Sequence, residues 1–172
     1  RVLQKSKLMS LSDCNWVNRN QNLIITGPTG AGKTYLACAM AHKACRLGYS
    51  SIYYRVTKLL EELALAKADD SYIKDLNRIA KKDVLVLDDW GLFSLTDEQS
   101  QFLAEIVEDR YDIRSTIITS QLPVDKWYGL ISNSTVGESI LDRITHNSHR
   151  FNLTGESMRK KLAGLENEKQ KG

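Results

Sequence analysis

Short apolar runs alternate with longer amphipathic segments along most of the chain. Runs rich in β-branched residues predict strands, and apolar positions spaced three and four residues apart predict helices. The expected strands are 22–26, 50–55, 83–91, 115–122 and 149–153, and the expected helices are 1–8, a short turn of helix within 13–21, 33–46, 57–68, 72–80, 97–110, 139–145 and 155–164. Strands that alternate with helices favour a parallel sheet covered by helices on both faces.

Local signals mark where several of these elements begin and end. Thr96 and Gln99 have the spacing of a capping box, which predicts that a helix begins at Asp97. Gly48 is expected to stop the helix before it, and Pro123 is expected to end the strand that precedes it.

The composition is that of an ordinary globular domain, with 42% hydrophobic and 26% charged residues among 172. This length suits one domain. We expect a main domain over 19–165, a basic helical lead-in over 1–18 and a polar tail over 166–172. The formal charge of +3 permits contact with a polyanion without requiring it. No apolar run approaches the ~20 residues that span a bilayer, so we expect no membrane contact.

The cysteines and histidines do not suggest a disulfide framework or a metal site. Cys14, Cys38 and Cys45 form an odd set without CxxC spacing, and the three histidines lack the spacing of metal ligands. Free thiols are typical of a reducing compartment, so we expect a cytoplasmic protein.

A glycine-rich loop follows the first strand in the stretch ITGPTGAGKTYL (25–36). It fits the pattern GxxxxGK[ST], and it has the strand before it and the helix after it that this pattern requires. Glycines let such a loop turn its N–H groups inward at a helix N-terminus, which makes a cradle for phosphate. We therefore predict bound ATP, with Lys33 on the β- and γ-phosphates and the Thr34 hydroxyl on Mg²⁺. The expected nucleotide contacts are Gly27, Pro28, Thr29, Gly30, Ala31, Gly32, Lys33, Thr34 and Tyr35.

Two carboxylates end the strongly apolar run VLVLDD (84–89). In isolation, paired acids after a strand are common in solvated turns. Downstream of a phosphate loop, however, Asp88 is expected to help hold Mg²⁺, and Asp89 is expected to orient or deprotonate the attacking water.

The strand over 115–122 ends in the polar residues Thr119, Ser120 and Gln121. One of them could report the γ-phosphate to the rest of the sheet. Gln121 is the preferred candidate and Ser120 the second, and a simple turn at the strand end remains an alternative.

Four stretches resemble the IstB family of transposition helper ATPases. They are NLIITGPTGAGKTYLACAMAHKACRLG, LVLDDWG, RYDIRSTIITSQLPVDKWY and ILDRITHNSHRFNLTGESMRKK. The resemblance runs from about Trp16 to Lys161. It implies an α/β fold of the P-loop NTPase (AAA+) type, a three-layer αβα sandwich with a central, mainly parallel five-stranded sheet and a reduced or absent C-terminal lid. It also implies an ATP-dependent homo-oligomer on duplex DNA that assists a cognate transposase.

The same resemblance suggests roles for three arginines. Arg143, in LDRI, matches the arginine finger that completes the site of a neighbouring subunit. Arg159, in GESMRK, is a candidate sensor that contacts phosphate within its own subunit, and Arg110 is a candidate for a subunit boundary.

The chain departs from the family pattern in two ways. Asp89 stands where many AAA+ proteins have glutamate, and its carboxylate is one methylene shorter, so hydrolysis is expected to be slow or to need a partner. The region before the main domain is also short, which weakens the expectation of transposase binding.

Sequence-independent DNA binding would use basic side chains repeated along the oligomer. The candidates are Lys5, Lys7, Lys81, Lys82, Arg159, Lys160 and Lys161, although each one alone is more typical of a solvated surface. Trp127 and Tyr128 could stack on bases, but packing after Pro123 is the favoured interpretation.

Three other functions remain possible from the sequence. A replicative helicase loader of the DnaC type shares the core motifs, and a preference for single-stranded DNA would favour it. A P-loop small-molecule kinase would need a lid with clustered arginines, which the sequence does not reveal. A scaffold that binds ATP without hydrolysing it is compatible with Asp89, and phosphate release would exclude it.

Overall fold

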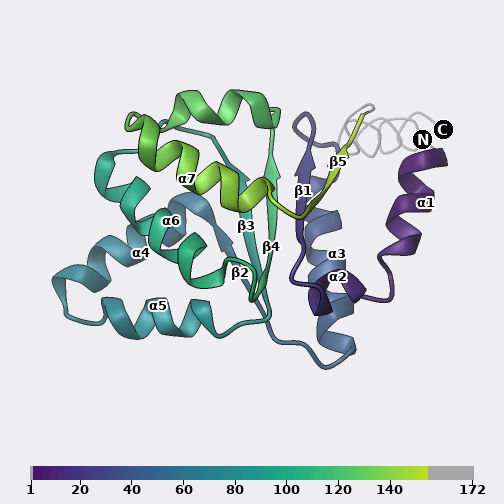
Figure 1. The fold of residues 1–172 in the computed structure, drawn as a ribbon, viewed down its shortest axis with the longest axis horizontal. Coiled ribbons are helices and arrows are strands. Elements are labelled where there is room, and N and C mark those ends of the chain that lie inside the picture. Colours follow the sequence, from purple (N-terminus) through teal and green to yellow (C-terminus); the bar gives the residue numbers. More distant parts are fainter. Residues whose placement is uncertain (1, 155–172) are drawn as a thin grey trace, which may run out of the picture.

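The fold is a five-stranded parallel sheet between two layers of helices, seen in a computed structural model that describes residues 2–154 (Figure 1). The strands are β1 (Asn22–Thr26), β2 (Ser51–Arg55), β3 (Val84–Trp90), β4 (Ser115–Ser120) and β5 (Ser148–Asn152). The helices are α1 (Val2–Ser10), α2 (Asn15–Asn18), α3 (Lys33–Arg46), α4 (Val56–Ala68), α5 (Tyr72–Ala80), α6 (Asp97–Arg110), the 3₁₀ helix η1 (Val124–Leu130) and α7 (Ser134–Thr145). The alternating order predicted from the sequence is confirmed.

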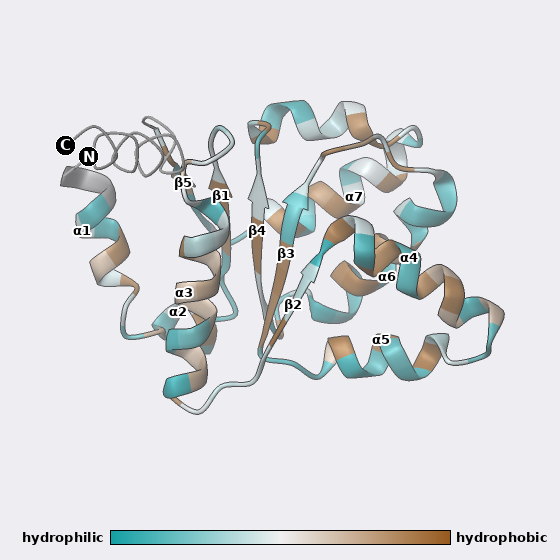
Figure 2. Cartoon of the chain, turned by 180° about the vertical axis from the view of Figure 1, so that it is seen from behind, coloured by the Kyte–Doolittle hydropathy of each residue, from teal (hydrophilic) through white to brown (hydrophobic). Residues whose placement is uncertain are grey.

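Each face of the sheet has its own hydrophobic core. Helices α4 to α7 cover one face and α3 covers the other, with α1 and α2 beside α3 (Figure 1). The brown, apolar segments of β3 and β4 lie between these layers (Figure 2). Leu11, Cys14, Trp16 and Val17 are buried in the α3 layer, so much of the lead-in packs as part of the main domain.

The strand order is β2-β3-β4-β1-β5, and every pairing is parallel. Strand β4 therefore lies between β1, which leads into the phosphate loop, and β3, which ends in the two carboxylates. Because parallel strands present their carboxyl ends at one edge of a sheet, the polar residues after β1, β3 and β4 meet there. Strand β2 forms the edge next to β3.

The predicted ends of most elements agree with the structure, and the start of α7 does not. The capping box is present: the Gln99 N–H donates to the Thr96 hydroxyl, and the Thr96 N–H donates to the Gln99 side chain. The sequence predicted that the helix before β5 begins at Ser139, whereas α7 begins at Ser134, one residue after its cap, Asn133. The first turn was not predicted because glycine, here Gly137, is a poor helix former. The lack of a side chain at Gly137 allows close packing against Ile131.

Several predictions concern residues outside the part of the chain that the structure describes. They are the helix over 155–164, the tail over 166–172, the lid, and the roles of Arg159, Lys160 and Lys161.

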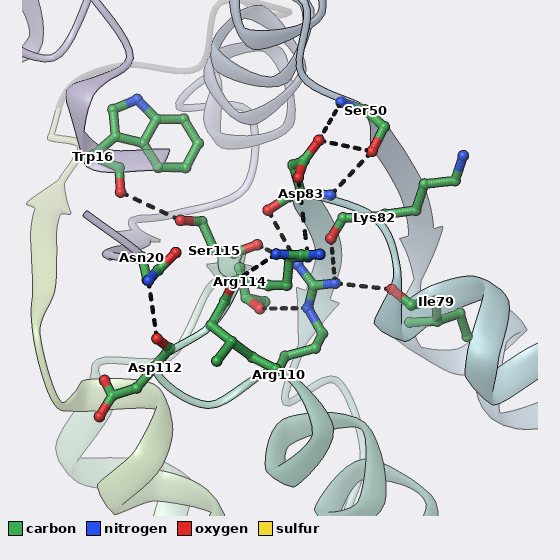
Figure 3. A network of polar contacts seen from close by, with 12 residues as sticks. Trp16, Asn20, Ser50, Ile79, Lys82, Asp83, Arg110, Asp112, Arg114 and Ser115 are labelled. Atoms are coloured by element: carbon green, nitrogen blue, oxygen red, sulfur yellow. Dashed lines mark hydrogen bonds and ion pairs between the residues drawn. The ribbon is translucent and has the colours of Figure 1, made fainter. Parts of the chain in front are cut away.

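The prediction that Arg110 faces a subunit boundary is wrong, because its side chain is buried within the domain (Figure 3). Its guanidinium donates to the carbonyls of Ile79, Lys82 and Ser115 at 2.8, 2.7 and 2.6 Å. Burial lowers the pKa of Arg110 to about 9, which leaves the group charged at neutral pH. Arg110 therefore ties the end of α5 to the beginnings of β3 and β4.

Replacing Arg110 by alanine is expected to lower the free energy of unfolding by about 3 kcal/mol, because several buried carbonyls each lose a charged donor at once. Urea unfolding followed by circular dichroism would measure the loss. Arg78→Ala is the matched control, since Arg78 is exposed and its partners among the described residues lie on the surface of α5 and β2. Equal stability of the two variants would contradict a structural role for Arg110.

Candidate functional site

The glycine-rich loop joins the end of β1 to the beginning of α3. Gly30 and Gly32 have φ angles of 80° and 94°, which other residues adopt at a cost, and the loop closes through an Ala31 N–H bond to the Pro28 carbonyl. Gly32 caps α3 without a side-chain hydrogen bond. The first N–H groups of α3 thus lack a side-chain acceptor, as in helix termini that bind phosphate.

Lys33 folds back over this loop. Its Nζ donates to the Pro28 carbonyl at 2.9 Å, and the residue is only 7% exposed. Burial lowers the pKa of Lys33, and the nearby carboxylates of Asp89 and Asp88 oppose this shift. The Lys33 amine is thus held beside the loop by a carbonyl, and no carboxylate of the described residues is bonded directly to it, which suits an incoming phosphate.

Gly27, the first glycine of the loop, lies against the backbone that follows the edge strand β5. A Cβ atom on Gly27 would lie 2.5 Å from the Leu153 carbonyl oxygen, and the φ angle of Gly27 is 151°. The Leu153 N–H donates to the Thr26 carbonyl at 2.7 Å, so the backbone after β5 is fastened to the end of β1.

Gly27→Ala is expected to push the loop away from this backbone and to lower the free energy of unfolding by about 1–3 kcal/mol. ATP affinity should fall as well, because the loop starts from a displaced position. Thermal unfolding and nucleotide titration would measure the two effects. Gly129→Ala is the control, since a Cβ there meets no atom within 4 Å. Unchanged stability and affinity in Gly27→Ala would show that the close approach is not important.

Asp88 is the most enclosed acid of the site, at 2% exposed. The Thr34 hydroxyl lies 2.9 and 3.0 Å from its two oxygens, and Thr119 and Tyr53 donate hydroxyl hydrogen bonds to it. A hydroxyl beside a carboxylate is a fitting pair of oxygen donors for Mg²⁺, which binds few protein groups and takes its other ligands from phosphates and water. Within residues 2–154 there is no group of three His, Cys, Asp or Glu side chains that could hold a metal ion by themselves.

Asp89 stands on a backbone irregularity at the end of β3. Its φ angle is 60°, and the register of β3 against β4 shifts between Leu87 and Trp90. The Asp89 N–H donates to the Thr119 hydroxyl at 3.0 Å. Its carboxylate pairs with Arg55 of β2, with 2.8 Å between Arg55 Nη2 and Asp89 Oδ2. The bulge turns this second carboxylate in a different direction from Asp88.

A hollow of ≈ 560 Å³ brings these groups together at the carboxyl edge of the sheet. It is lined by Thr29, Gly30, Gly32, Lys33, Thr34, Tyr35, Tyr53, Arg55, Asp88, Asp89, Leu92 and Gln121. Most of the predicted nucleotide contacts thus surround one space, and Pro28 adds the carbonyl that holds Lys33.

The two candidate reporters after β4 differ in position. Gln121 lines the hollow. Ser120 is fully buried, and its hydroxyl donates to the Trp90 carbonyl and accepts from the Leu122 N–H, so it fastens β4 to β3 instead. The geometry therefore favours Gln121 as the group that faces a nucleotide.

Arg143 lies at the opposite edge of the sheet, near the end of α7. The next residue, Ile144, accepts a hydrogen bond from Asn22 at the start of β1, whereas the hollow lies beyond the end of β1. The Arg143 guanidinium pairs with Glu108 at 2.6 Å and lies over the ring of Tyr111. Arg143 therefore points away from the hollow of its own chain.

Three residues that contact the carboxylates were not predicted from the sequence as members of the site. They are Tyr53 and Arg55 on β2 and Thr119 on β4. The pattern of an edge strand does not show which loop its side chains reach, and Thr119 was considered only as a reporter of phosphate. The alternation of Tyr53 and Arg55 along β2 was the available signal, since residues two apart share one face of a strand.

The four candidate DNA contacts that the structure describes do not form one patch within a subunit. Lys5 and Lys7 are on α1, beside β5, whereas Lys81 and Lys82 follow α5 at the amino edge of the sheet (Figure 1). Lys7 is also engaged, because it donates to the Arg150 carbonyl and lies over Phe151.

The packing role of Trp127 is confirmed. Its ring is fully buried against Trp90, and its Nε1 donates to the Leu122 carbonyl at 3.0 Å. Tyr128 is exposed on η1.

Among the described residues, no helix has the length and apolar character needed to cross a bilayer.

The sequence matches a family described as IstB-like ATP binding proteins over residues 1–165. It is 48% identical over 160 residues to a putative insertion sequence ATP-binding protein of Sinorhizobium fredii, covering 93% of this chain and 65% of that protein. It is also 48% identical over 123 residues to the putative ATP-binding protein of insertion sequence IS1162 from Pseudomonas fluorescens, covering 72% of this chain and 53% of that protein. The chain thus spans between about half and two thirds of the length of these relatives.

Two solved structures have a closely similar fold. The DnaC helicase loader gives a TM-score of 0.75 at 24% identity, covering 86% of each chain. The DnaI structure gives a TM-score of 0.75 at 23% identity, covering 88% of this chain and 85% of that one. With the strand order described above, these likenesses show a P-loop αβα fold.

Proposed function

Because the chain belongs to the family of IstB-like ATP-binding proteins, we propose that it hydrolyses ATP and assembles on duplex DNA to assist a transposase. ATP binding is the property of the family, and hydrolysis, assembly and the two macromolecular partners are the proposal. The observation that carries it is the single hollow lined by Lys33, Thr34, Asp88 and Asp89.

The residues around the hollow divide the chemistry between them. The N–H groups at the start of α3 and the Lys33 amine bind and orient the phosphates. Thr34 and Asp88 would hold Mg²⁺, which on binding would neutralise charge that develops on the phosphates. Asp89 would orient the attacking water and accept its proton. Gln121, which lines the hollow, would contact the terminal phosphate.

The ion pair between Arg55 and Asp89 is a reason to expect slow ATP hydrolysis in the resting chain. A carboxylate engaged by a guanidinium is not free to accept a proton from water, so Arg55 must withdraw before Asp89 can act. Both this requirement and the shorter reach of aspartate compared with glutamate would slow hydrolysis. We therefore propose that DNA or another subunit stimulates turnover.

Assembly would bring Arg143 of one subunit to the nucleotide of the next. Because Arg143 lies at the edge of the sheet opposite its own hollow, it suits a head-to-tail contact in which two different faces meet. The guanidinium would then stabilise the charge on the transferring phosphoryl group. For this step the Arg143 side chain must leave Glu108 and Tyr111, which it contacts in the resting chain.

The transposase is the proposed protein partner because the relatives are named as ATP-binding proteins of insertion sequences. DNA binding would be independent of sequence and would sum modest contacts over many subunits, since the four candidate lysines that the structure describes lie on separate parts of the fold. The cytoplasm, where ATP and the chromosome meet, is the proposed compartment. The DnaC-type helicase loader is the alternative within the same fold.

Sedimentation at low salt with ATP and Mg²⁺ tests this proposal. We expect large particles on duplex DNA with ATP, smaller species without nucleotide, and dissociation when salt is raised. Released phosphate, measured on the same samples, would exclude a non-hydrolysing scaffold. A preference for single-stranded DNA would favour the helicase loader instead. Phosphate transfer from ATP to a nucleoside would favour a small-molecule kinase, and a monomer under every condition would contradict assembly.

A further inference from the structure

We propose that Tyr53 is a positioning residue for magnesium binding. Its hydroxyl and that of Thr119 clamp the Asp88 carboxylate from both sides and fix the orientation in which the ion is held. This inference rests on the proposed function, because it takes Asp88 as the carboxylate that holds Mg²⁺.

The clamp places one hydroxyl on each carboxylate oxygen. Tyr53 donates to Asp88 Oδ2 at 2.7 Å, and Thr119 donates to Asp88 Oδ1 at 2.5 Å. Thr34 lies close to both oxygens. Rotation of the carboxylate about its Cβ–Cγ bond would break the bonds to Tyr53 and Thr119 together, so the two donors fix the plane of the group.

The two donors come from the strands on either side of β3. Strand β2 pairs Tyr53 with Val86, two residues before Asp88, and the long tyrosine side chain spans this offset. Strand β4 supplies Thr119, which is fully buried and also accepts the Asp89 N–H. The orientation of the Asp88 carboxylate is thus fixed by hydrogen bonds from both neighbouring strands.

Core packing does not account for Tyr53. Its neighbours Ile52 and Tyr54 pack against the hydrophobic core under α4 to α7, whereas Tyr53 belongs to neither of the two cores formed by the described residues. Tyr53 is 43% exposed and lines the hollow. The hydrogen bond of its hydroxyl to Asp88 is therefore the contact that gives this position a role.

Magnesium is sensitive to such positioning. It requires near-ideal octahedral geometry, so a carboxylate already held in the right plane loses less freedom when the ion binds. Outer partners of metal-holding groups commonly contribute 10-fold or more to metal affinity. Removing the Tyr53 hydroxyl while keeping its ring should therefore weaken magnesium binding without disturbing the phosphate loop.

The test is the affinity of the full chain for a fluorescent ATP analogue, first in a chelator and then as free Mg²⁺ is raised. For Tyr53→Phe we expect the half-saturating Mg²⁺ concentration to rise about 10-fold. Its affinity in the chelator should equal that of the parent. Tyr49→Phe is the control, because it removes a hydroxyl just before the other end of β2. An unchanged Mg²⁺ requirement in Tyr53→Phe would overturn the proposal.

The partner hydroxyl gives an independent check. Thr119→Val should raise the Mg²⁺ requirement, and Thr119→Ser should restore it, because serine keeps the donor. If Thr119→Val fails to fold, Tyr53→Phe still decides the question. A parent protein whose nucleotide affinity ignores Mg²⁺ would overturn the proposed magnesium site itself, whereas a Mg²⁺-dependent parent with an unaffected Tyr53→Phe would overturn only the clamp.

Discussion

Arg143→Ala is expected to lower ATP turnover on duplex DNA by about 10³-fold, the scale of effect seen when an arginine finger is lost. The guanidinium acts on charge that develops in the transition state, so its loss should leave ATP affinity within a single subunit unchanged. Phosphate release and nucleotide titration on the same preparation would separate the two effects. Arg46→Ala, at the exposed end of α3, is the matched control.

Mixing two inactive variants tests whether the site is shared. Asp89→Ala lacks the water-orienting carboxylate but keeps Arg143, and Arg143→Ala has the opposite defect. Where an Arg143→Ala subunit supplies the hollow and an Asp89→Ala neighbour supplies the arginine, one complete site forms. We therefore expect mixed samples to recover part of the parental turnover. A loss of ATP affinity in Arg143→Ala, or no recovery on mixing, would contradict a role across the subunit boundary.

Lys33→Ala is expected to weaken ATP binding by about 100-fold, since a charge-assisted hydrogen bond to phosphate contributes up to ~3 kcal/mol. The lysine is already buried beside the loop, so little ordering is needed when phosphate arrives. Calorimetric titration with ATP would measure the change. Lys43→Ala removes an exposed lysine from the same helix and should bind as the parent does.

Lys33→Ala has a second expected consequence within the loop. The Pro28 carbonyl loses the Lys33 amine and keeps the Ala31 N–H as a donor, so the loop should become more mobile. Faster amide exchange over 27–32 in the variant, with unchanged exchange in β1, would show this effect. Equal ATP affinity in Lys33→Ala and the parent would contradict the assignment of this loop as the phosphate site.

The sequence predicted the layers of the fold because the signals are local. Strands β1, β3 and β4 are short, largely apolar runs, and the capping box at Thr96 predicts where α6 begins. The start of α7 was not predicted because glycine, here Gly137, is a poor helix former. Glycine at this position allows close contact with Ile131, and the sequence does not reveal that contact. Arg110 was misplaced for the same kind of reason: a buried arginine and a surface arginine look alike until their partners are known.

The candidate site was predicted where one motif contains all its parts. The phosphate loop has its glycines, lysine and threonine within a few residues, so their spacing alone indicates the chemistry. Tyr53, Arg55 and Thr119 reach Asp88 and Asp89 from other strands. Those contacts depend on strand order and register, which a single sequence constrains weakly.

The position of β4 between β1 and β3 has a consequence for the order in which the chain can acquire its structure. Leu23 of β1 pairs with Ile117 of β4 and His149 of β5, so β1 has no partner strand until β4 has been synthesised. During translation the phosphate loop is therefore made early but becomes anchored late. Until then the apolar residues of β1 are open to misassociation, as unpaired strands are in slowly formed folds. Nascent chains arrested before β4 should accordingly fail to retain nucleotide, although they already carry the entire glycine-rich loop.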